Sequence, residues 1–203
     1  MLICSCKKED DDEPKSWKTL FFDDFNRADG DLGSDYRAAI GVTIRNNKVI
    51  DTDEYYAFSY KKEIANDKIK VSAKIITEDI VPTTGGFGFD ARSSGEVDAP
   101  ESYYVALIYV EEGSIGIFKS TTGSDFEELS KKDFVLTSNK IYVLTFEIDG
   151  GMLTMNLEDT STGIIETLTV TDTSPLITGY SGYSGYQLDQ DLYVDDFKIE
   201  IFE

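Results

Sequence analysis

Apolar and polar residues alternate along most of the chain from Trp17 onward, with the period of two that predicts β-strands. In residues 68–76, Ile69, Val71, Ala73 and Ile75 fall on one face and the lysines and the serine on the other. Residues 141–149 and 152–159 repeat the pattern on either side of a Gly-Gly pair, which predicts a hairpin. Further strands are expected at residues 19–25, 42–46, 55–60, 86–92, 103–110, 114–120, 164–170 and 191–202. About a dozen short strands predict an all-β fold, a two-sheet antiparallel sandwich or a barrel.

Three segments depart from simple alternation. Residues 53–65 and 125–132 show some helical spacing, but the first is rich in aromatic residues and the second is short, so neither is expected to organise the fold. Residues 103–110 are apolar on both faces, which favours a position at the centre of a sheet.

Length and charge restrict the class of protein. A chain of 203 residues suits one domain with a substantial core. The net charge of −20 argues against nucleic-acid binding, because a phosphate backbone is neutralised by clustered lysine and arginine. This charge is compatible with divalent cations, with neutral glycans, or with solubility alone. The chain has no histidine, so the usual general base at neutral pH is missing and any catalysis would fall to carboxylates.

The N-terminal residues predict a membrane address. The chain's two cysteines are Cys4 and Cys6, and the sequence ICSC around them resembles the end of a bacterial lipoprotein signal in which Cys6 receives the lipid. Such a signal has an apolar run of about 7–15 residues before this point, and we expect most of that run to be missing ahead of Cys6. The alternative is an ordinary N-terminal tail with two incidental cysteines.

The run that follows Cys6 predicts a tether. Residues 7–14 are charged and carry no large apolar side chain, which is typical of a disordered segment. This acidic stretch directly behind Cys6 resembles the signal that, in the Bacteroidetes, sends lipoproteins to the outer face of the outer membrane. We therefore expect residues 1–16 to be a signal remnant and tether, and residues 17–203 to be the folded domain, with the lipid as its membrane attachment.

The two ends of the domain resemble a known superfamily. The first strand lies within LFFDDFNRADGDLGSDY (residues 20–36) and the last within DLYVDDFKIE (residues 191–200). Between them, GGFGFDARSS is followed by ESYYVALIYV. Together these motifs resemble the concanavalin A-like lectin/glucanase superfamily, the laminin-G-like jelly rolls. The resemblance implies one concave and one convex sheet with the first and last strands side by side. It also implies a non-catalytic, lectin-like domain that binds carbohydrate, or a protein-contact and adhesion module of laminin-G type.

The last strand raises the question of a metal. By period two, Asp195 shares the core-facing side with Phe197, and a carboxylate there needs compensation. Relatives in the superfamily often hold a structural Ca²⁺ near this edge, so the resemblance implies Asp195 as a ligand with Asp24 contributing. The alternative is that Asp195 caps loop amides or pairs with Arg27.

The heptapeptide GEVDAPE, residues 95–101, resembles the catalytic strand of the retaining β-glucanases, with Glu96 and Glu101 as the weak catalytic candidates of a glycoside hydrolase. Pro100 removes a backbone donor and disfavours a central strand, so we expect a solvated loop that joins two strands. A third interpretation is a Ca²⁺ site formed by Glu96, Asp98 and Glu101 in that loop.

Candidate sugar-binding residues come from the tyrosines and one arginine. Tyr180, Tyr183 and Tyr186 lie in the low-complexity stretch GYSGYSGY, where they would stack on sugars or pack within a loop and strand edge. Arg92 ends a predicted strand and would bond sugar hydroxyls, or neutralise Asp90 or Glu101. Tyr104 carries the same two alternatives.

Overall fold

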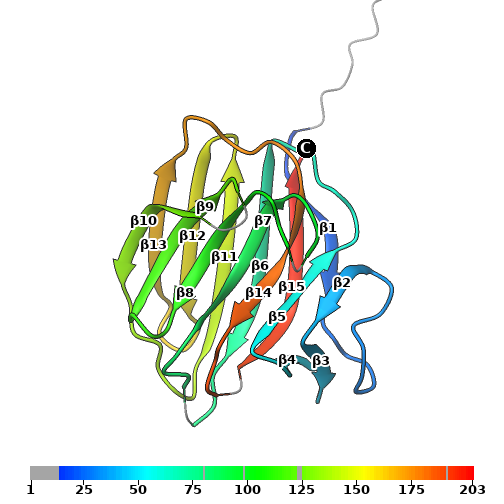
Figure 1. Cartoon of the computed structure of the whole chain (residues 1–203), viewed down its shortest axis with the longest axis vertical. Coiled ribbons are helices and arrows are strands. Elements are labelled where there is room, and N and C mark those ends of the chain that lie inside the picture. Colours follow the sequence, from blue (N-terminus) through cyan, green and yellow to red (C-terminus); the bar gives the residue numbers. More distant parts are fainter. Residues whose placement is uncertain (1–13, 80, 98, 123–124, 191) are drawn as a thin grey trace, which may run out of the picture.

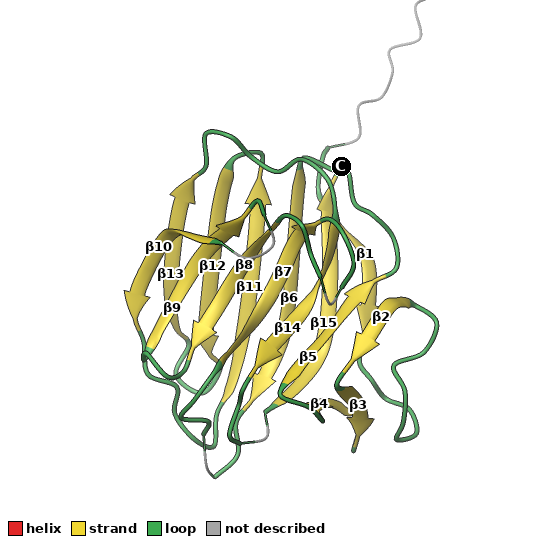
Figure 2. Cartoon of the chain, in the orientation of Figure 1, coloured by secondary structure: helices red, strands yellow, loops and turns green. Residues whose placement is uncertain are grey.

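The computed structural model describes residues 14–79, 81–97, 99–122, 125–190 and 192–203. The proposed lipidation residue Cys6 and the carboxylate Asp98 lie outside the described residues. The described part of the chain is all β and forms no helix, and hence no helical segment with the length and hydropathy needed to span a membrane (Figure 2). The strands are β1 (Trp17–Asp23), β2 (Tyr36–Ile40), β3 (Val42–Arg45), β4 (Lys48–Asp51), β5 (Tyr55–Tyr60), β6 (Lys68–Ile76), β7 (Gly86–Ser93), β8 (Tyr103–Tyr109), β9 (Ser114–Ser120), β10 (Phe126–Asp133), β11 (Ile141–Asp149), β12 (Met152–Asp159), β13 (Ile164–Thr171), β14 (Tyr180–Tyr186) and β15 (Tyr193–Phe202).

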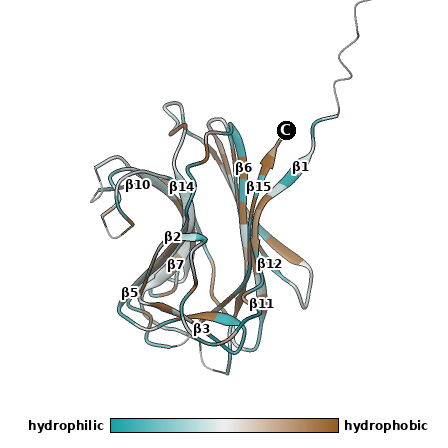
Figure 3. Cartoon of the chain, turned by 90° about the vertical axis from the view of Figure 1, so that its right-hand side faces the viewer, coloured by the Kyte–Doolittle hydropathy of each residue, from teal (hydrophilic) through white to brown (hydrophobic). Residues whose placement is uncertain are grey.

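The strands form two antiparallel sheets that pack face to face (Figures 1 and 3). The back sheet has eight strands in the order β13-β12-β11-β6-β15-β4-β3, with β1 paired to β15. The front sheet has seven strands in the order β10-β9-β8-β7-β14-β5-β2. The all-β fold predicted from alternation is therefore confirmed, and of its two alternatives the structure shows the two-sheet sandwich and not the barrel.

The core lies between the sheets because each strand turns alternate side chains inward. On β6 the pattern is regular, since Ile69, Val71, Ala73 and Ile75 are all buried. Aromatic rings fill the space beneath the front sheet: the rings of Phe58 and Tyr183 stack with centroids 5.4 Å apart. The outward positions of both sheets are thereby left for solvent or for a ligand.

The paired ends expected from the resemblance are confirmed. Trp17 is the Cα partner of Phe202, and β1 runs antiparallel to β15. Trp17 therefore begins β1, two residues before the strand expected at residues 19–25. Residues 103–109 form β8, which lies between β7 and β9 and is almost completely buried, as its two apolar faces predict.

Two segments differ from their sequence-based interpretation. Residues 126–133 form β10, because tertiary pairing overrides the weak helical spacing of residues 125–132. Residues 55–60 form the predicted strand, β5, despite the helical spacing of residues 53–65. The stretch 179–186 is no edge: it forms β14, which lies between β7 and β5. Its small residues permit that place, since a Cβ on Gly182 would lie 2.0 Å from the Phe58 carbonyl oxygen, and one on Gly185 would lie 2.1 Å from the Tyr56 hydroxyl.

Candidate ligand-binding groove

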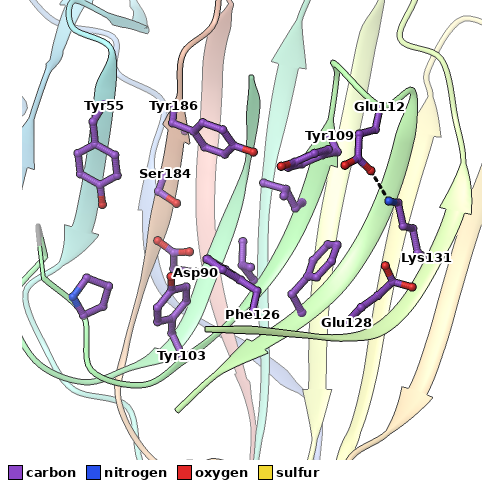
Figure 4. Close-up of a pocket in the computed structure, with 15 residues that line it drawn as sticks. Tyr55, Asp90, Tyr103, Tyr109, Glu112, Phe126, Glu128, Lys131, Ser184 and Tyr186 are labelled. Atoms are coloured by element: carbon purple, nitrogen blue, oxygen red, sulfur yellow. Dashed lines mark hydrogen bonds and ion pairs between the residues drawn. The ribbon is translucent and has the colours of Figure 1, made fainter. Parts of the chain in front are cut away.

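A groove of about 450 Å³ lies on the outer face of the front sheet (Figure 4). Strands β5, β14, β7, β8, β9 and β10 all contribute side chains to it, and Pro100 of the β7–β8 loop lines one side. Because strands of one sheet form its floor, the groove is already present in the isolated chain.

Aromatic rings form much of the groove lining. Tyr103 and Tyr109 come from β8, Tyr186 from β14, and Phe126 from β10. The rings of Tyr103 and Phe126 meet edge to face at 5.7 Å, and those of Tyr109 and Tyr186 lie 6.1 Å apart. Phe126 remains 55% exposed and Tyr55, on β5, 40%. Such rings offer apolar faces to a ligand, and the tyrosines add hydroxyl groups at its rim.

Alternation explains why these residues face outward. On β7, Phe87 and Phe89 point into the core, so Asp90 between Phe89 and the buried Ala91 points into the groove. On β14, Tyr183 is buried in the core and the next residue, Ser184, lines the groove. The groove therefore has a polar floor of one carboxyl and one hydroxyl group between aromatic walls.

Asp90 is the electrostatic centre of this floor. Burial raises the pKa of its carboxyl to about 6, while a hydrogen bond with the Ser184 hydroxyl acts in the opposite direction. Asp90 retains a partly exposed side, so the groove reaches it even though protein atoms exclude most bulk water. Burial, followed by the negative charge of Asp90, raises the pKa of Tyr103. Among the described residues no basic side chain forms an ion pair with Asp90.

The other end of the groove carries an ion pair. Lys131 on β10 bonds Glu112, and this hydrogen bond raises the pKa of the lysine (Figure 4). The ammonium of Lys131 also lies 5.9 Å from the Tyr109 ring centroid. Glu128 lines the same end. Three carboxylates and one ammonium group thus border the groove, which gives it a negative charge.

The predicted sugar-binding residues fall in different places. Tyr186 lines the groove. Tyr180 lies under the guanidinium of Arg37, which is 4.0 Å from its ring centroid, and it does not line the groove. Tyr183 is 2% exposed and packs in the core. Tyr104 is fully buried, and its hydroxyl donates to Asp172 at 2.6 Å. The placement of Tyr183 and Tyr104 contradicts a role as exposed sugar platforms, because their inward parity buries both rings.

Arg92 was expected at a sheet surface and is instead buried, with 2% of its surface exposed. Its backbone adopts a φ of +58°, and this left-handed conformation departs from the alternation that would have placed the side chain outside. The guanidinium donates to the backbone carbonyls of Ile64, Asn66 and Ile177. Arg92 therefore fastens two loops to β7, and no ion pair links it to Asp90 or Glu101.

GEVDAPE forms the connection between β7 and β8, as the proline predicts. Gly95 and Pro100 form an isolated bridge, and Glu96 and Glu101 are exposed. Arg37 and Tyr55 hold the loop by donating to its backbone carbonyls, Tyr55 to that of Val97 at 3.2 Å. The two glutamates stand outside the groove lining, whereas Pro100 is part of it.

The structure corrects the assigned direction of Asp195. β15 carries a β-bulge between Asp195 and Lys198, with Asp196 at a φ of +53°. The extra residue reverses the alternation, so Asp195 stands opposite Lys74, on the outer face of β6, and not with the buried Phe197. Burial nevertheless raises the pKa of the Asp195 carboxyl, which also accepts a hydrogen bond from the Asp196 amide.

The proposed Ca²⁺ partner, Asp24, is exposed and accepts a hydrogen bond from the Asn26 amide at 3.1 Å. Arg27 pairs with Asp23, at 2.6 and 2.9 Å, and not with Asp195. Within the described residues, no group of three or more acidic, cysteine or histidine side chains is placed to hold a metal ion. The calcium site stays a prediction without a preformed ligand set in these residues.

The sequence interpretation missed Asp90 as a groove residue. The signal was available, because Asp90 is the charged residue in the otherwise apolar segment 86–91, and alternation places it opposite in direction to Phe87 and Phe89. What the sequence did not reveal was which face of that strand would be hollow. That depends on β10, whose pairing with β9 brings Phe126 to the groove.

Comparisons with known proteins establish the fold. No family model matches the chain, and no curated protein sequence matches it either. Among solved structures, the carbohydrate-binding module CBM66 from Bacillus subtilis has a TM-score of 0.60 and 15% identity over 91% of this chain and 94% of its own. The winged bean acidic lectin complexed with methyl-α-D-galactose has a TM-score of 0.67 and 12% identity, over 94% of this chain and 100% of the lectin.

A third structure agrees with these two. Lectin I from Ulex europaeus, in complex with the methyl glycoside of α-L-fucose, has a TM-score of 0.64 and 12% identity over 92% of this chain and 97% of its own. Sequence identities this low show the fold alone and assign no function to individual residues. The chain therefore has the lectin-like jelly-roll sandwich fold, in agreement with the resemblance to the concanavalin A-like superfamily seen in its sequence.

Proposed function

We propose that this protein binds carbohydrate in the groove of the front sheet. The observation that carries the proposal is the set of aromatic rings around Asp90 and Ser184. Sugar rings present apolar C–H faces and hydroxyl groups. The aromatic walls of the groove can contact the C–H faces, and its polar floor can hydrogen-bond the hydroxyl groups. The lectin-like fold supports this assignment, because several neighbours with that fold are carbohydrate-binding modules or lectins in complex with sugars.

The proposed role is binding without cleavage. A glycosidase of the usual kind places two carboxyl groups across one glycosidic bond, one as acid and one as base or nucleophile. Here the weak catalytic candidates Glu96 and Glu101 lie on an exposed loop outside the groove lining. Within the groove, Glu112 is held by Lys131. This arrangement favours capture of a glycan over hydrolysis.

The N-terminal sequence supports a place for this activity at the cell surface. We propose that lipid on Cys6 anchors the domain to the outer membrane and that the acidic run after it acts as a spacer. Radiolabelled palmitate incorporated into the wild-type protein, and lost in Cys6→Ala but retained in Cys4→Ala, would support this. Equal labelling of both variants would contradict it.

The test of glycan binding is a panel of neutral, acidic and amine-bearing polysaccharides, measured by affinity electrophoresis and calorimetry with the full chain. Reducing sugar released during the same incubation is assayed in parallel. Saturable binding without release supports the proposal, and binding that is unchanged in Tyr103→Ala and Tyr186→Ala would place it outside the groove. Release that disappears in Glu96→Gln would instead establish a hydrolase.

A second candidate is a protein-contact module, favoured by the exposed apolar residues on the edge strand β13. Ile164 and Ile165 are 59% and 54% exposed there, and an edge strand is a site where another chain can pair. Two observations together would favour this candidate. No polysaccharide of the panel would bind, and analytical ultracentrifugation would show self-association that Ile165→Lys abolishes.

A further inference from the structure

We infer that the groove selects glycans that carry a protonated amine, such as hexosamine residues with a free amino group. This inference deepens the proposed carbohydrate binding and rests on it. In the groove, the carboxyl group of Asp90 has no basic partner among the described residues and lies among aromatic rings. An ammonium group on a sugar can pair with the carboxylate and also contact the ring faces.

The charges of the groove support a cationic ligand. Asp90, Glu112 and Glu128 border it, against the single ammonium of Lys131. Lys131 already bonds Glu112, at the end of the groove formed by β10 and the loop after β8. The negative charge at Asp90 is therefore not met by any ion pair within the described residues. An acidic glycan would be repelled by this lining, in keeping with the net charge of the whole chain, −20.

The surroundings of Asp90 make its charge costly without a ligand. Tyr103 and Val105 of β8, Ser184 of β14 and Pro100 of the loop line the groove around it. Of these neighbours, Ser184 bonds the carboxyl group, and Tyr103 is the titratable one. Burial raises the pKa of Asp90 to about 6, so the group is ionised at neutral pH but poorly solvated. A sugar hydroxyl offers it a hydrogen bond, whereas an ammonium group offers a hydrogen bond and the opposite charge.

The aromatic lining adds a second contribution. Tyr103, Tyr186 and Phe126 bring rings to the same groove as Asp90 (Figure 4). A cation over such a ring is attracted by its π electrons. The chain itself makes this contact outside the groove, where the ammonium of Lys70 lies 4.0 Å from the centroid of the Trp17 ring and Arg37 lies 4.0 Å from that of Tyr180. In the groove, Lys131 lies 5.9 Å from the centroid of the Tyr109 ring, at the end away from Asp90. At the rings beside Asp90, the corresponding cation would come from the ligand.

The experiment compares sugars that differ at one position. The probes are β-1,4-linked glucosamine, N-acetylglucosamine and glucose tetramers, and the methyl glycosides of galactosamine, N-acetylgalactosamine and galactose, measured by calorimetry with the full chain at low salt. We expect the free-amine member of at least one series to bind about tenfold or more tightly than its acetylated and hydroxyl counterparts. In Asp90→Asn this preference disappears, because the amide keeps the shape and loses the charge.

Two controls separate the charge of Asp90 from the overall charge of the protein. Asp31→Asn removes an exposed carboxylate that does not line the groove, and it should keep the preference. An N-trimethylated methyl glucosaminide carries a charge that does not titrate. Its affinity should fall several-fold between about pH 7.5 and about pH 5 as Asp90 gains a proton, and Asp90→Asn should lose this dependence.

The outcomes distinguish this inference from the proposed function. Binding of neutral polysaccharides with no preference for the amine overturns the inference and leaves carbohydrate binding intact. An amine preference that survives in Asp90→Asn also overturns it, because another group would then supply the charge. If neither these probes nor the polysaccharide panel binds, both the inference and the proposed function fail.

Discussion

The two outer faces of the sandwich carry their charges differently. On the back sheet, lysines of β6 meet carboxylates of the neighbouring strands: Lys68 lies 2.9 Å from Asp149, and Lys70 lies 3.0 Å from Glu200. On the front sheet, Asp90 stands among aromatic rings without such a partner in the described residues. These back-face carboxylates are thus satisfied by cross-strand pairs. The front face leaves the Asp90 carboxyl group without a basic partner in the described residues, and this difference supports our proposal that the front face binds the ligand.

The largest expected effect is a loss of stability at Asp172. This interior carboxylate has the basic partner that Asp90 lacks. Asp172 accepts hydrogen bonds from Lys119 at 2.7 Å and Tyr104 at 2.6 Å. Although burial acts to raise it, these bonds hold the pKa of Asp172 below its usual value. We expect Asp172→Asn to lower the free energy of unfolding by about 3 kcal/mol, because it leaves the buried ammonium of Lys119 unpaired. Urea unfolding at neutral pH measures this, and a loss below about 1 kcal/mol would show that solvent satisfies the lysine.

Filling the groove should abolish binding without harming the fold. Ser184→Trp places an indole beside Asp90 in the space that a sugar would occupy, so affinity for any glycan found by the panel should fall by about 100-fold or more. The matched change on the back sheet is Thr169→Trp, at an exposed position of β13, and it should leave affinity unchanged within about twofold. Equal losses in both variants, measured by calorimetry, would contradict the assignment of the front face.

Removing the charge of Asp90 should stabilise the protein at neutral pH. Its folded-state pKa is raised to about 6 from 3.8, so the folded state binds the proton more tightly than the unfolded chain. The stabilisation from this proton is complete below about pH 4 and is lost as the pH rises through about 6. Asp90→Asn should therefore raise the unfolding free energy relative to wild type by about 2 kcal/mol at pH 8 and by little at pH 4.

The measurement is the difference in unfolding free energy between wild type and Asp90→Asn at several pH values, by urea denaturation. Taking the difference cancels the contributions of other titrating groups. A variant that is less stable than wild type at pH 8 would mean that Asp90 has a compensating partner in solution, and the contrast between the two faces would then be weaker than the structure shows.

The smallest effect is expected on the back face. Glu200→Gln removes the ion pairs with Lys70 and Lys198, at 3.0 and 3.2 Å. Burial acts to raise the pKa of Glu200, but these two lysines hold it below its usual value. We expect a loss of about 1 kcal/mol or less in the free energy of unfolding, which shrinks in about 1 M salt. Glycan affinity should not change, and a change would show that the two faces are coupled.

The sequence predicted most of the strands but only part of the site. Regular alternation, as in residues 68–76, predicted strand and inward face together, because a strand with one buried face has no other register. Arg92 and Asp195 were misplaced for one reason: each lies at or next to a backbone irregularity with positive φ, which breaks the period of two. Tyr183 was misplaced because a stretch of glycine, serine and tyrosine looks like a loop until its neighbours pair with it.

By itself, the sequence predicted an all-β fold and the loop character of GEVDAPE, because alternation sets the buried face of each strand and proline removes a ladder donor. The pairing of the two ends was implied only by the resemblance of their motifs to a known superfamily. Tertiary structure alone decided that Asp90, Ser184, Tyr103 and Phe126 meet in one groove. Those residues come from four strands, and the order β10-β9-β8-β7-β14 that assembles them depends on long-range pairing, which no local pattern encodes.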